Sequence, residues 1–265
     1  MSSRIDQLKA FWDNFSQVYY ETMESITSQI FNGILPLIRI ENAKNILEVA
    51  CGPGNGVEIM CSKKPENAKI TACDFSDGML EIARNRGLRD SEFFLANNEE
   101  LPFDDCAFDR YVANMSLHIV DHPDKMIKEA FRVLQKGGIA VFSSIGIPGP
   151  GNFVMMIGDS MVEAGVPKSP DSPFDMNNDE MVRKMAKEAG FSKVLTFHSS
   201  AFIPAVNPEE VYRLIERSSL FDRAKKVSPE AHTRSIEIFI NRASQVLDSG
   251  RLLTSEYLVT VAFKD

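Results

Sequence analysis

Short apolar runs alternate with segments of helical periodicity between residues 44 and 145 of this chain. Each run is rich in aliphatic or aromatic side chains and stops at glycine, proline or a polar residue, which is typical of buried strands. The runs occupy residues 45–50, 69–73, 92–95, 108–113 and 139–143. Because strands and helices take turns along the chain, the pattern predicts an α/β fold with a doubly wound, mostly parallel sheet.

The helix between the fourth and fifth runs shows the periodicity most clearly. Its apolar positions recur on one face: Met126, Ile127, Ala130, Val133 and Leu134. A face of this kind packs against a sheet. Gly137 follows shortly afterwards, and glycine readily adopts the left-handed conformation that ends many helices. We therefore expect Gly137 to end this helix.

Two irregular segments, residues 146–175 and 202–250, interrupt the alternation. The first is rich in proline and methionine, and residues 155–185 hold six of the chain's 12 methionines. Methionines at this density fit either an adaptable substrate surface or the core of a mobile cap. The second contains Asn207–Pro208 and Ser228–Pro229, where a capping side chain followed by proline predicts a helix start. We expect both segments to be cap insertions.

The alternation resumes between and after these segments. The periodicity of residues 181–189 predicts a helix that ends at Gly190, and residues 193–197 follow as a strand. The chain closes with the apolar run 257–263, which is typical of a strand buried on both faces. Together with the five earlier runs, these make seven expected strands.

Residues 5–37, before the sheet, are also expected to be helical. Trp12, Phe15, Tyr19 and Met23 recur at spacings of three and four, so they form an aromatic stripe on one helix face. Two interpretations stay open: the stripe packs on the sheet, or it forms a lid over a ligand. The expected organisation is an N-terminal helical lid followed by one main domain: residues 1–40 and 41–265.

Charge limits the partners of this protein. Its 265 residues carry 29 Lys and Arg against 37 Asp and Glu, which gives a net charge of −8. An acidic surface repels phosphate backbones, and no basic run is longer than two residues. Nucleic acid is therefore not expected as a partner. The hydrophobic fraction, 44%, is that of an ordinary globular protein.

The four cysteines, Cys51, Cys61, Cys73 and Cys106, lack the C-x-x-C spacing of a zinc or redox site. We expect free thiols, no bound metal and a cytoplasmic location, where thiols stay reduced. The first residues lack the apolar core of a secretory signal. No uncharged apolar run approaches the roughly 20 residues that a membrane span needs.

The strongest chemical signal follows the first strand, where Glu48 precedes Gly52, Gly54 and Gly56. Glycines at a strand-to-helix turn let the backbone approach a ligand at the edge of the sheet. A dinucleotide site would need its third glycine at position 57, which is Val57. The acid also opposes a pyrophosphate and favours a ligand with a cationic end.

This motif resembles the first motif of the class I S-adenosylmethionine-dependent methyltransferases, an acid followed by spaced glycines. The resemblance implies a Rossmann-like seven-stranded sheet with an antiparallel last strand, and S-adenosylmethionine as cofactor. It places Glu48 near the ammonium end of the cofactor, and the backbone of Ala50, Gly52 and Gly54 along the methionine portion. Because Ala50 stands where the family has its first glycine, we expect the loop to persist with slightly less room.

Later motifs agree with the family in order and spacing. By resemblance, Asp74 accepts hydrogen bonds from both ribose hydroxyls, and Phe75 and Met79 flank the adenine. Asn97 stands where the family usually has an acid that meets the adenine amino group. The amide carbonyl of Asn97 can still accept that hydrogen bond, but without the assistance of a charge.

The resemblance extends the cofactor site beyond these residues. The further positions come from the predicted lid, from the loop after the third strand and from the loop after the fourth: Tyr19, Asn98, Glu99, Asn114 and Met115. Residues 131–138 read F-R-V-L-Q-K-G-G, close to the R-V-L-K-P-G-G segment of the family. These similarities cover residues 40–145.

Methyl transfer is an in-line displacement at a sulfonium methyl group, so such an enzyme mainly aligns the acceptor and excludes water. His118 lies after the fourth strand, at the sheet edge where active sites of this fold collect. It is the candidate general base for a hydroxyl, a phenol or an acidic carbon. The alternative is that His118 orders its loop or touches the cofactor.

The chain is most similar to the branch of the family that includes quinone and sterol C-methyltransferases and small-amine N-methyltransferases. We expect a small-molecule acceptor that is neutral, apolar or cationic, given the net charge of −8. Two alternatives stay open. A cofactor-binding pseudoenzyme or regulatory subunit would lack an acceptor pocket, and Ala50 and Asn97 point mildly that way. A nicotinamide-dependent oxidoreductase would share the fold, but the glycine spacing opposes it.

Overall fold

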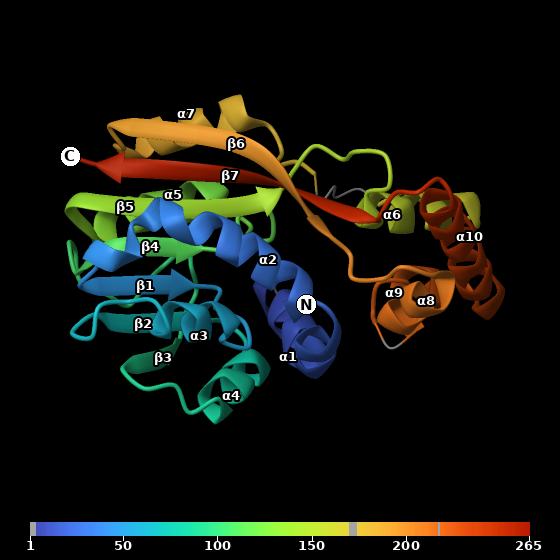
Figure 1. Ribbon diagram of the computed structural model, residues 1–265, viewed down its shortest axis with the longest axis horizontal. Helices are drawn as coiled ribbons and strands as arrows, with labels where there is room; N and C mark the ends of the chain where they lie inside the picture. The colour runs from blue at the N-terminus through green and yellow to red at the C-terminus, as the bar shows by residue number, and fades with distance from the viewer. Residues whose placement is uncertain (1–3, 170–173, 217) are drawn as a thin grey trace.

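One seven-stranded sheet forms the centre of the computed structural model, which describes residues 4–169, 174–216 and 218–265 (Figure 1). The strand order is β3-β2-β1-β4-β5-β7-β6. The strands are β1 Asn45–Val49, β2 Lys69–Asp74, β3 Ser91–Leu95, β4 Phe108–Ala113, β5 Leu134–Ile145, β6 Lys193–Phe202 and β7 Thr254–Lys264. Only β7 runs antiparallel to its neighbours, so the predicted doubly wound sheet with an antiparallel last strand is confirmed.

Helices cover both faces of this sheet. The helices that link the strands are α3 Asn55–Cys61, α4 Asp77–Asn85, α5 Pro123–Val133 and α7 Asp179–Ala189. A buried core lies on each face, and the neighbouring residues Ile46 and Leu47 of β1 belong to opposite cores. Met60 and Leu80, from α3 and α4, join the first core, and Met126 of α5 joins the second. The alternation of the sequence thus produces a three-layered sandwich.

The carboxyl ends of the central strands meet at one edge of the sheet. Val49 of β1 is in register with Cys73 of β2 and with Ala113 of β4. The loops that follow these three strands therefore lie together, although they are far apart in the sequence. In open parallel sheets this edge is where ligands bind.

Two helices precede the sheet, α1 Arg4–Thr22 and α2 Glu24–Ile34, and short 3-10 turns follow, η1 Leu35–Ile38 and η2 Ile40–Asn42. The helical prediction for residues 5–37 is confirmed. Lys9 of α1 pairs with Asp77 at the start of α4, with 2.7 Å between Nζ and Oδ2. Figure 1 shows α1 and α2 between the sheet and the helices at the far end of the molecule.

The two irregular segments pack together into one helical unit, which we call the cap. It contains α6 Phe153–Glu163, α8 Pro208–Glu216, α9 Asp222–Val227 and α10 Pro229–Asp248. The ring of Phe239 in α10 contacts α6 and the residue before α9, with its centroid 5.4 Å from that of Phe153 and 5.6 Å from that of Phe221. Figure 1 shows the cap beyond the ends of β6 and β7. Pro170 and Pro173 of the first segment lie outside the described residues.

The predicted helix boundaries at three positions are confirmed. Asn207 Oδ1 accepts a hydrogen bond from the backbone N–H of Glu210 at 2.9 Å, and Ser228 Oγ accepts one from Ala231 at 3.0 Å. Gly190 ends α7 with φ 115°. The two N-caps accept hydrogen bonds from nearby backbone N–H groups, and the left-handed glycine turns the chain out of the helix. These effects are local, which is why the sequence alone indicated them.

The prediction that Gly137 ends the preceding helix was wrong. α5 ends at Val133, and Leu134 is already extended, with ψ 137°, as the first residue of β5. Leu134 pairs with Phe108 of β4, so sheet pairing takes it out of the helix in spite of its helical spacing. Gly137 does adopt the left-handed region, with φ 78°, but inside the strand.

Two further elements differ from the expectation: β6 is longer, and the methionine-rich segment contains a helix. β6 runs to Phe202 instead of stopping at residue 197, because it pairs with β7 along its whole length. The methionine-rich segment contains α6, which no periodicity indicated. Its start carries a local signal nonetheless, since Asn152 Oδ1 accepts a hydrogen bond from the backbone N–H of Met155 at 2.7 Å.

Within the described ranges, no helix combines the length and apolar character needed to cross a membrane. The same residues hold no group of three or more His, Cys, Asp or Glu side chains arranged for a metal ion. All four cysteines are free thiols, with Cys51 and Cys73 buried, Cys61 half-buried and Cys106 exposed.

Candidate active site

A cavity of about 500 Å³ lies where the carboxyl edge of the sheet faces α1, α2 and the cap. Its walls come from three parts of the chain: the loops after β1 to β4, the two N-terminal helices, and α6 with its cap neighbours. This volume is within the range of sites for drug-sized ligands. The cavity therefore joins the predicted cofactor loops to the segments predicted to select a substrate.

The loop after β1 brings Ala50 and Gly52 to the cavity wall. Ala50 has φ 48° and Gly52 has φ 54°, so both lie in the left-handed region. Glycine adopts this region without strain, whereas a residue with a Cβ pays roughly 1–2 kcal/mol. The expectation that Ala50 would only reduce the space in the loop was therefore incomplete, because its main effect is the strain of a left-handed backbone conformation.

Gly54 begins α3 with φ 85° and does not line the cavity. A Cβ at this position would lie 3.0 Å from the Cβ of Ala83 in α4. The glycine thus allows α3 and α4 to approach each other closely. Its predicted contact with the cofactor stays a prediction, and the structure gives it a packing role in addition.

Glu48 is only 2% exposed and lines a second, small cavity beside the glycine loop. Its Oε2 atom has no hydrogen-bond partner among the described residues. Burial, with a contribution from the charge of Asp74, raises the pKa of Glu48 well above its ordinary value. A buried carboxyl group with an unused oxygen is costly unless a donor or a cation reaches it. This position therefore suits the cationic end of a ligand.

A side chain would not fit at position 56, because Glu48 occupies the space beside Gly56. A Cβ at Gly56 would lie 2.1 Å from Glu48 Oε1 and 2.5 Å from the ring of Phe31. The third glycine of the motif thus makes room for the buried acid rather than for a ligand. The buried position of Glu48 therefore requires a glycine at position 56 of the motif.

Asp74 ends β2 with a buried carboxylate in the cavity wall. Its Oδ2 accepts a hydrogen bond from the backbone N–H of Gly52 at 2.9 Å, and its Oδ1 accepts one from Ser76 at 2.9 Å. Burial raises the pKa of Asp74 to about 6, although these backbone hydrogen bonds lower it in part. Each carboxylate oxygen keeps a further lone pair, so the group can still accept hydrogen bonds from ligand hydroxyls.

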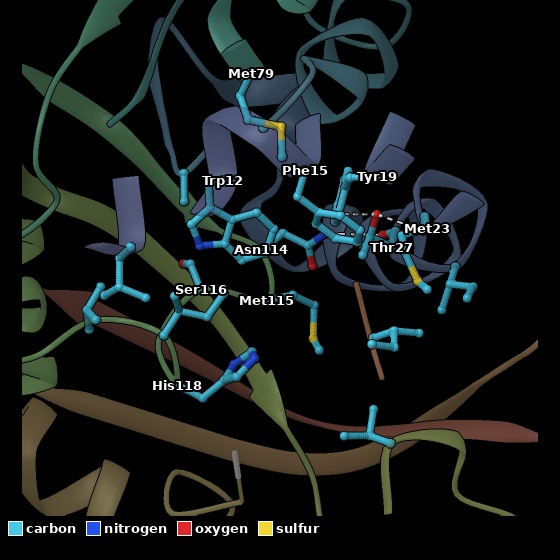
Figure 2. Close-up of a pocket in the computed structure, with 18 of the residues that line it drawn as sticks. Trp12, Phe15, Tyr19, Met23, Thr27, Met79, Asn114, Met115, Ser116 and His118 are labelled. Carbon is cyan, nitrogen blue, oxygen red and sulfur yellow. Dashed lines mark hydrogen bonds between the residues drawn. The ribbon is translucent and has the colours of Figure 1, made fainter. Parts of the chain in front are cut away.

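Phe75 and Met79 line the cavity next to Asp74. Figure 2 shows Met79 reaching toward the cavity on the side of Trp12 and Phe15. An aromatic ring and a thioether offer apolar, polarizable surfaces of the kind that hold a flat ring. Their placement agrees with the predicted adenine contacts, which remain predictions.

The loop after β3 supplies Asn97, Asn98 and Glu99 to the same wall. Asn97 Oδ1 accepts a hydrogen bond from the backbone N–H of Glu99 at 3.0 Å, so part of its acceptor capacity is used within the loop. Glu99 Oε1 accepts from the backbone N–H groups of Asp121 and His122, at 2.8 Å and 3.1 Å. The carboxylate of Glu99 therefore holds a neighbouring loop in place.

The loop after β4 is fixed by a short chain of hydrogen bonds. Asn114 Nδ2 donates to Thr27 O of α2 at 3.1 Å, and Asn114 Oδ1 accepts from Ser143 Oγ at 2.8 Å. Met115 N donates to the same Ser143 hydroxyl at 2.7 Å. Met115 has φ 51°, a conformation that costs free energy for a residue with a side chain. Asn114 and Met115 both line the cavity, and their predicted contact with the cofactor stays a prediction.

His118 follows in the same loop and lines the cavity. Figure 2 shows its ring directed toward Met115, with Trp12 on the other side of the cavity. The Nδ1 atom is buried and has no hydrogen-bond partner in the described part of the chain. Burial lowers the pKa of His118 to about 4, so its imidazole is neutral at pH 7. The candidate base is therefore in the cavity and unprotonated.

The aromatic stripe forms another wall, since Trp12, Phe15 and Tyr19 of α1 line the cavity together with Met23, which lies between α1 and α2. The ring centroid of Trp12 lies 6.0 Å from those of Phe15 and Tyr19. Tyr19 OH lies 3.0 Å from Thr27 Oγ1 of α2 in a hydrogen bond drawn in Figure 2. Both interpretations of this stripe stay open, because its residues line the cavity and Phe15 is also buried.

The cap adds a mainly apolar wall. The sequence predicted the cap segments but not the residues that line the cavity. The apolar lining of this wall comes from α6 and from residues near α8 and α9: Phe153, Ile157, Met161, Ile203 and Leu220. Arg223 also lines the cavity and donates a hydrogen bond to Pro167 O at 2.7 Å. No pattern in the sequence could have singled out these residues, because the contact between the two cap segments decides which side chains face the cavity.

The methionine-rich segment mostly builds the cores. Met161 lines the cavity, whereas Met156 and Met176 are buried and do not line it. Met181 is exposed. Of the two interpretations of these methionines, packing within the cap and the domain core therefore accounts for more of them.

Comparison with known proteins gives a matching domain. Residues 47–142 match the family described as "Methyltransferase domain". A demethylmenaquinone methyltransferase of Clavibacter sepedonicus is 31% identical over 156 residues, which are 56% of this chain and 62% of the relative. A ubiquinone/menaquinone biosynthesis C-methyltransferase of Brucella anthropi is 37% identical over 110 residues, 38% of this chain and 42% of the relative. The match thus spans less than two thirds of either relative.

The fold also matches solved structures. The crystal structure of the (4+2)-cyclase SpnF superposes with a TM-score of 0.60 at 19% identity. The superposition covers 89% of this chain and 81% of the cyclase chain. At this level of identity the likeness concerns the fold, and it extends well beyond residues 47–142.

Proposed function

We propose that this chain, a member of the class I S-adenosylmethionine-dependent methyltransferases, transfers the methyl group of its cofactor to a small, largely apolar acceptor. One observation carries the proposal. A single cavity joins the loops that hold Ala50, Asp74 and Asn97 to the apolar wall of the cap. Direct transfer needs the cofactor and the acceptor in one enclosed space, because reacting atoms must meet in line and away from water.

The residues of the cavity fit the cofactor. S-adenosylmethionine supplies an activated methyl group on a sulfonium centre. Glu48 would hold its ammonium end, Asp74 its ribose hydroxyls and Asn97 its adenine amino group. Support comes from burial: Asp74 lies in the wall of the large cavity and Glu48 in the wall of the small cavity beside the glycine loop, and Glu48 Oε2 lacks a partner among the described residues. The same two acids oppose the pyrophosphate of a nicotinamide cofactor.

The other residues position the acceptor and keep water out. Trp12 and Phe15 cover the cavity from α1, while Phe153 and Ile157 cover it from the cap. His118 is neutral and can accept a hydrogen bond or a proton from the acceptor. A general base works best when its pKa lies near the working pH, and a pKa of about 4 makes His118 a weak base. We therefore assign His118 mainly to orienting the acceptor.

The cap wall favours an aromatic or alicyclic acceptor, because Phe153, Ile157 and Met161 offer apolar surface. One relative is named for demethylmenaquinone, an apolar aromatic molecule, and the other is named a C-methyltransferase. A quinone-like acceptor methylated at carbon fits both this wall and these names. Within the range expected from the sequence, the neutral and apolar classes are thus preferred over the cationic one.

We further propose that α1 and α2 act as a lid and that the cap selects the acceptor. The stripe Trp12, Phe15, Tyr19 and Met23 faces the cavity, as a lid requires. The cofactor loops and the cap form different walls of the same cavity. Changes in the cap should therefore alter acceptor choice without altering cofactor affinity.

A cofactor-binding protein with another reaction, or with none, is a second candidate. One observation favours it, since the similarly folded SpnF is a cyclase. The pseudoenzyme interpretation, however, implies that the acceptor pocket is lacking. The apolar wall formed by Phe153, Ile157 and Ile203 argues against that interpretation.

Isothermal titration calorimetry tests the proposal at its first step. The full chain should bind S-adenosylhomocysteine and show no heat with NAD. Turnover is then assayed with radiolabelled S-adenosylmethionine against phenols, quinols, amines and carboxylic acids, and label should pass to a neutral aromatic acceptor. Binding of NAD without S-adenosylhomocysteine would overturn the proposal. Cofactor binding without turnover on any class would favour the second candidate.

A further inference from the structure

Ser116 and His118 have buried polar atoms without a hydrogen-bond partner among the described residues. Ser116 is 3% exposed, and both its Oγ and the Nδ1 of His118 are enclosed. Both residues line the large cavity, and Figure 2 shows them together below α1. Buried polar groups in folded proteins are nearly always hydrogen-bonded, so an unpaired pair facing a cavity indicates a ligand.

The backbone of the loop explains why both side chains face the same space. The left-handed Met115 turns the chain after β4, and Ile119 N donates to Ser116 O at 2.9 Å, which closes a tight turn. Leu117, between the two polar residues, is 1% exposed and packs into the core behind the loop. Ser116 and His118, on either side of Leu117, both line the cavity.

The chemistry of the pair indicates what it recognises. A serine hydroxyl can donate and accept a hydrogen bond at the same time, and a neutral imidazole nitrogen does one or the other. Neither group carries a charge at neutral pH. Such a pair satisfies an uncharged oxygen, whereas it offers no counter-charge to an ammonium or a carboxylate.

We infer that Ser116 and His118 form a two-point hydrogen-bonding site for a hydroxyl or carbonyl oxygen of the methyl acceptor. This inference rests on the proposed function and narrows its substrate class to neutral acceptors that carry oxygen. Ser116 then determines specificity, because a site built to bond an oxygen leaves its own buried groups unpaired when an analogue lacks it. An acceptor without that oxygen should bind weakly for this reason.

Probe binding to the chain saturated with S-adenosylhomocysteine tests the inference. The probes are 2-naphthol, 2-naphthoate and 2-naphthylmethylammonium, which share a ring system and differ in the charge of the polar group. Calorimetry should give 2-naphthol the highest affinity. Ser116→Ala should weaken 2-naphthol binding about fivefold, the loss of one hydrogen bond, with S-adenosylhomocysteine affinity unchanged.

A stability measurement keeps the test independent of the choice of probe. Ser144 is a matched control, since it is equally buried but its Oγ donates to Met176 O at 2.9 Å. Ser144→Ala should lower the Tm of the unliganded chain by about 2–4 °C, and Ser116→Ala should leave it unchanged or raise it. The hydroxyl of Ser116 has no partner to lose within residues 4–169, 174–216 and 218–265, so its removal should cost the fold nothing.

The outcomes separate this inference from the proposed function. Failure of the wild-type chain to bind S-adenosylhomocysteine contradicts the proposed function. Normal cofactor binding with equal affinity for all three probes contradicts only the inference. A Ser116→Ala variant that loses S-adenosylhomocysteine affinity, or that unfolds as early as Ser144→Ala, also overturns it, because Ser116 would then serve the cofactor or the fold.

Discussion

The carboxylate of Asp13 on α1 accepts a hydrogen bond from the hydroxyl of Ser76, with 2.7 Å between the oxygens. The backbone N–H of Ser76 donates to Asp74 Oδ1 at 2.9 Å, so one residue connects α1 to the acid of the proposed ribose site. Asp13 Oδ1 also accepts from Gly78 N at 3.1 Å, at the start of α4. The placement of α1 over the cavity is therefore coupled to the loop of the proposed ribose site.

Asp13→Ala should loosen α1 and weaken cofactor binding. Two hydrogen bonds at the start of α4 are lost, which should lower the free energy of unfolding by about 1–2 kcal/mol. Trp12 is the single tryptophan of the chain and lies next to Asp13, so its fluorescence reports on α1. The change in Trp12 emission on adding S-adenosylhomocysteine should shrink in the variant. Asn14→Ala, an exposed neighbour, serves as control, and equal responses of both variants would refute the coupling.

Gly78→Ala should have the same effect from the other side of the contact. A Cβ at Gly78 would lie 2.8 Å from Asp13 O and 2.8 Å from Ser16 Oγ, so α1 would have to move away. Overpacking of this kind typically costs about 1–3 kcal/mol. Gly87→Ala is not a suitable comparison because Gly87 has φ 64°. If the melting curve and the Trp12 titration of the variant equal those of the wild type, the close packing of α1 against Gly78 is refuted.

Ala50→Gly should stabilise the protein. Ala50 adopts φ 48° at the cavity edge, and glycine removes the left-handed strain of roughly 1–2 kcal/mol, less its greater entropy in the unfolded chain. We expect a net gain of about 0.5–1 kcal/mol in chemical denaturation. Ala72→Gly, in β2 and without positive φ, should instead lose about 0.5–1 kcal/mol. If both substitutions destabilise alike, the left-handed conformation of Ala50 is refuted.

Cofactor affinity should rise with pH through Glu48. Burial and the charge of Asp74 raise the pKa of Glu48 in the unliganded chain, and a cationic ligand end favours its ionised form. Binding should therefore release a proton, and affinity should increase by up to about tenfold per pH unit below that pKa. Calorimetry of S-adenosylhomocysteine binding in buffers of different ionisation enthalpy measures this release. Glu48→Gln should abolish this proton release. Glu66→Gln, a substitution at an exposed residue, should leave it unchanged.

His118 should make the fold sensitive to acid. Its folded pKa of about 4 lies below the unfolded value of about 6.5, so the unfolded chain takes up the proton first as the pH falls. The stability contributed by neutral His118 is present above pH 6.5 and is lost progressively toward pH 4. Between pH 7 and pH 5 the wild type should lose about 2 kcal/mol relative to His118→Gln. Parallel denaturation curves for both proteins at the two pH values would contradict this.

Asp74 acts in the opposite direction over the same range. Its pKa of about 6 lies above the ordinary value of 3.8, so the fold gains stability from Asp74 as the pH falls through 6. The pH dependence of the wild type alone therefore contains two opposing contributions. The comparison with His118→Gln isolates the histidine because Asp74 is the same in both proteins.

The local signals of the sequence predicted much of the fold. Asn207, Ser228 and Gly190 mark helix boundaries through groups within four residues of them, so no knowledge of the tertiary structure was needed. Leu134 shows where this approach fails. Its spacing is helical, but pairing with Phe108 places it in a strand, and that contact joins residues that are distant in the sequence.

The candidate site divides in the same way. Asp74 ends β2 and Asn97 lies two residues after β3, and the parallel register of the sheet brings such positions together, so the motifs were sufficient to place both in one wall of the cavity. Ser116 gave no signal, because its proposed role depends on its lacking a partner in the described part of the chain and on a cavity whose other walls come from α1 and the cap. The face that α1 presents to the cavity likewise depends on the contact between Asp13 and Ser76.

The cap connects to the sheet at neighbouring points, although its segments are separated in the sequence. Phe202 at the end of β6 pairs with Thr254 at the start of β7, and Ile145 at the end of β5 pairs with Tyr257. Ile203 N donates to Leu253 O at 2.8 Å, one step beyond the sheet. Because the crossings lie side by side, the cap could be exchanged at these junctions with little change to the sheet. If the cap selects the acceptor, as proposed, such an exchange should change the acceptor range and leave the loops after β1 to β4 unaltered.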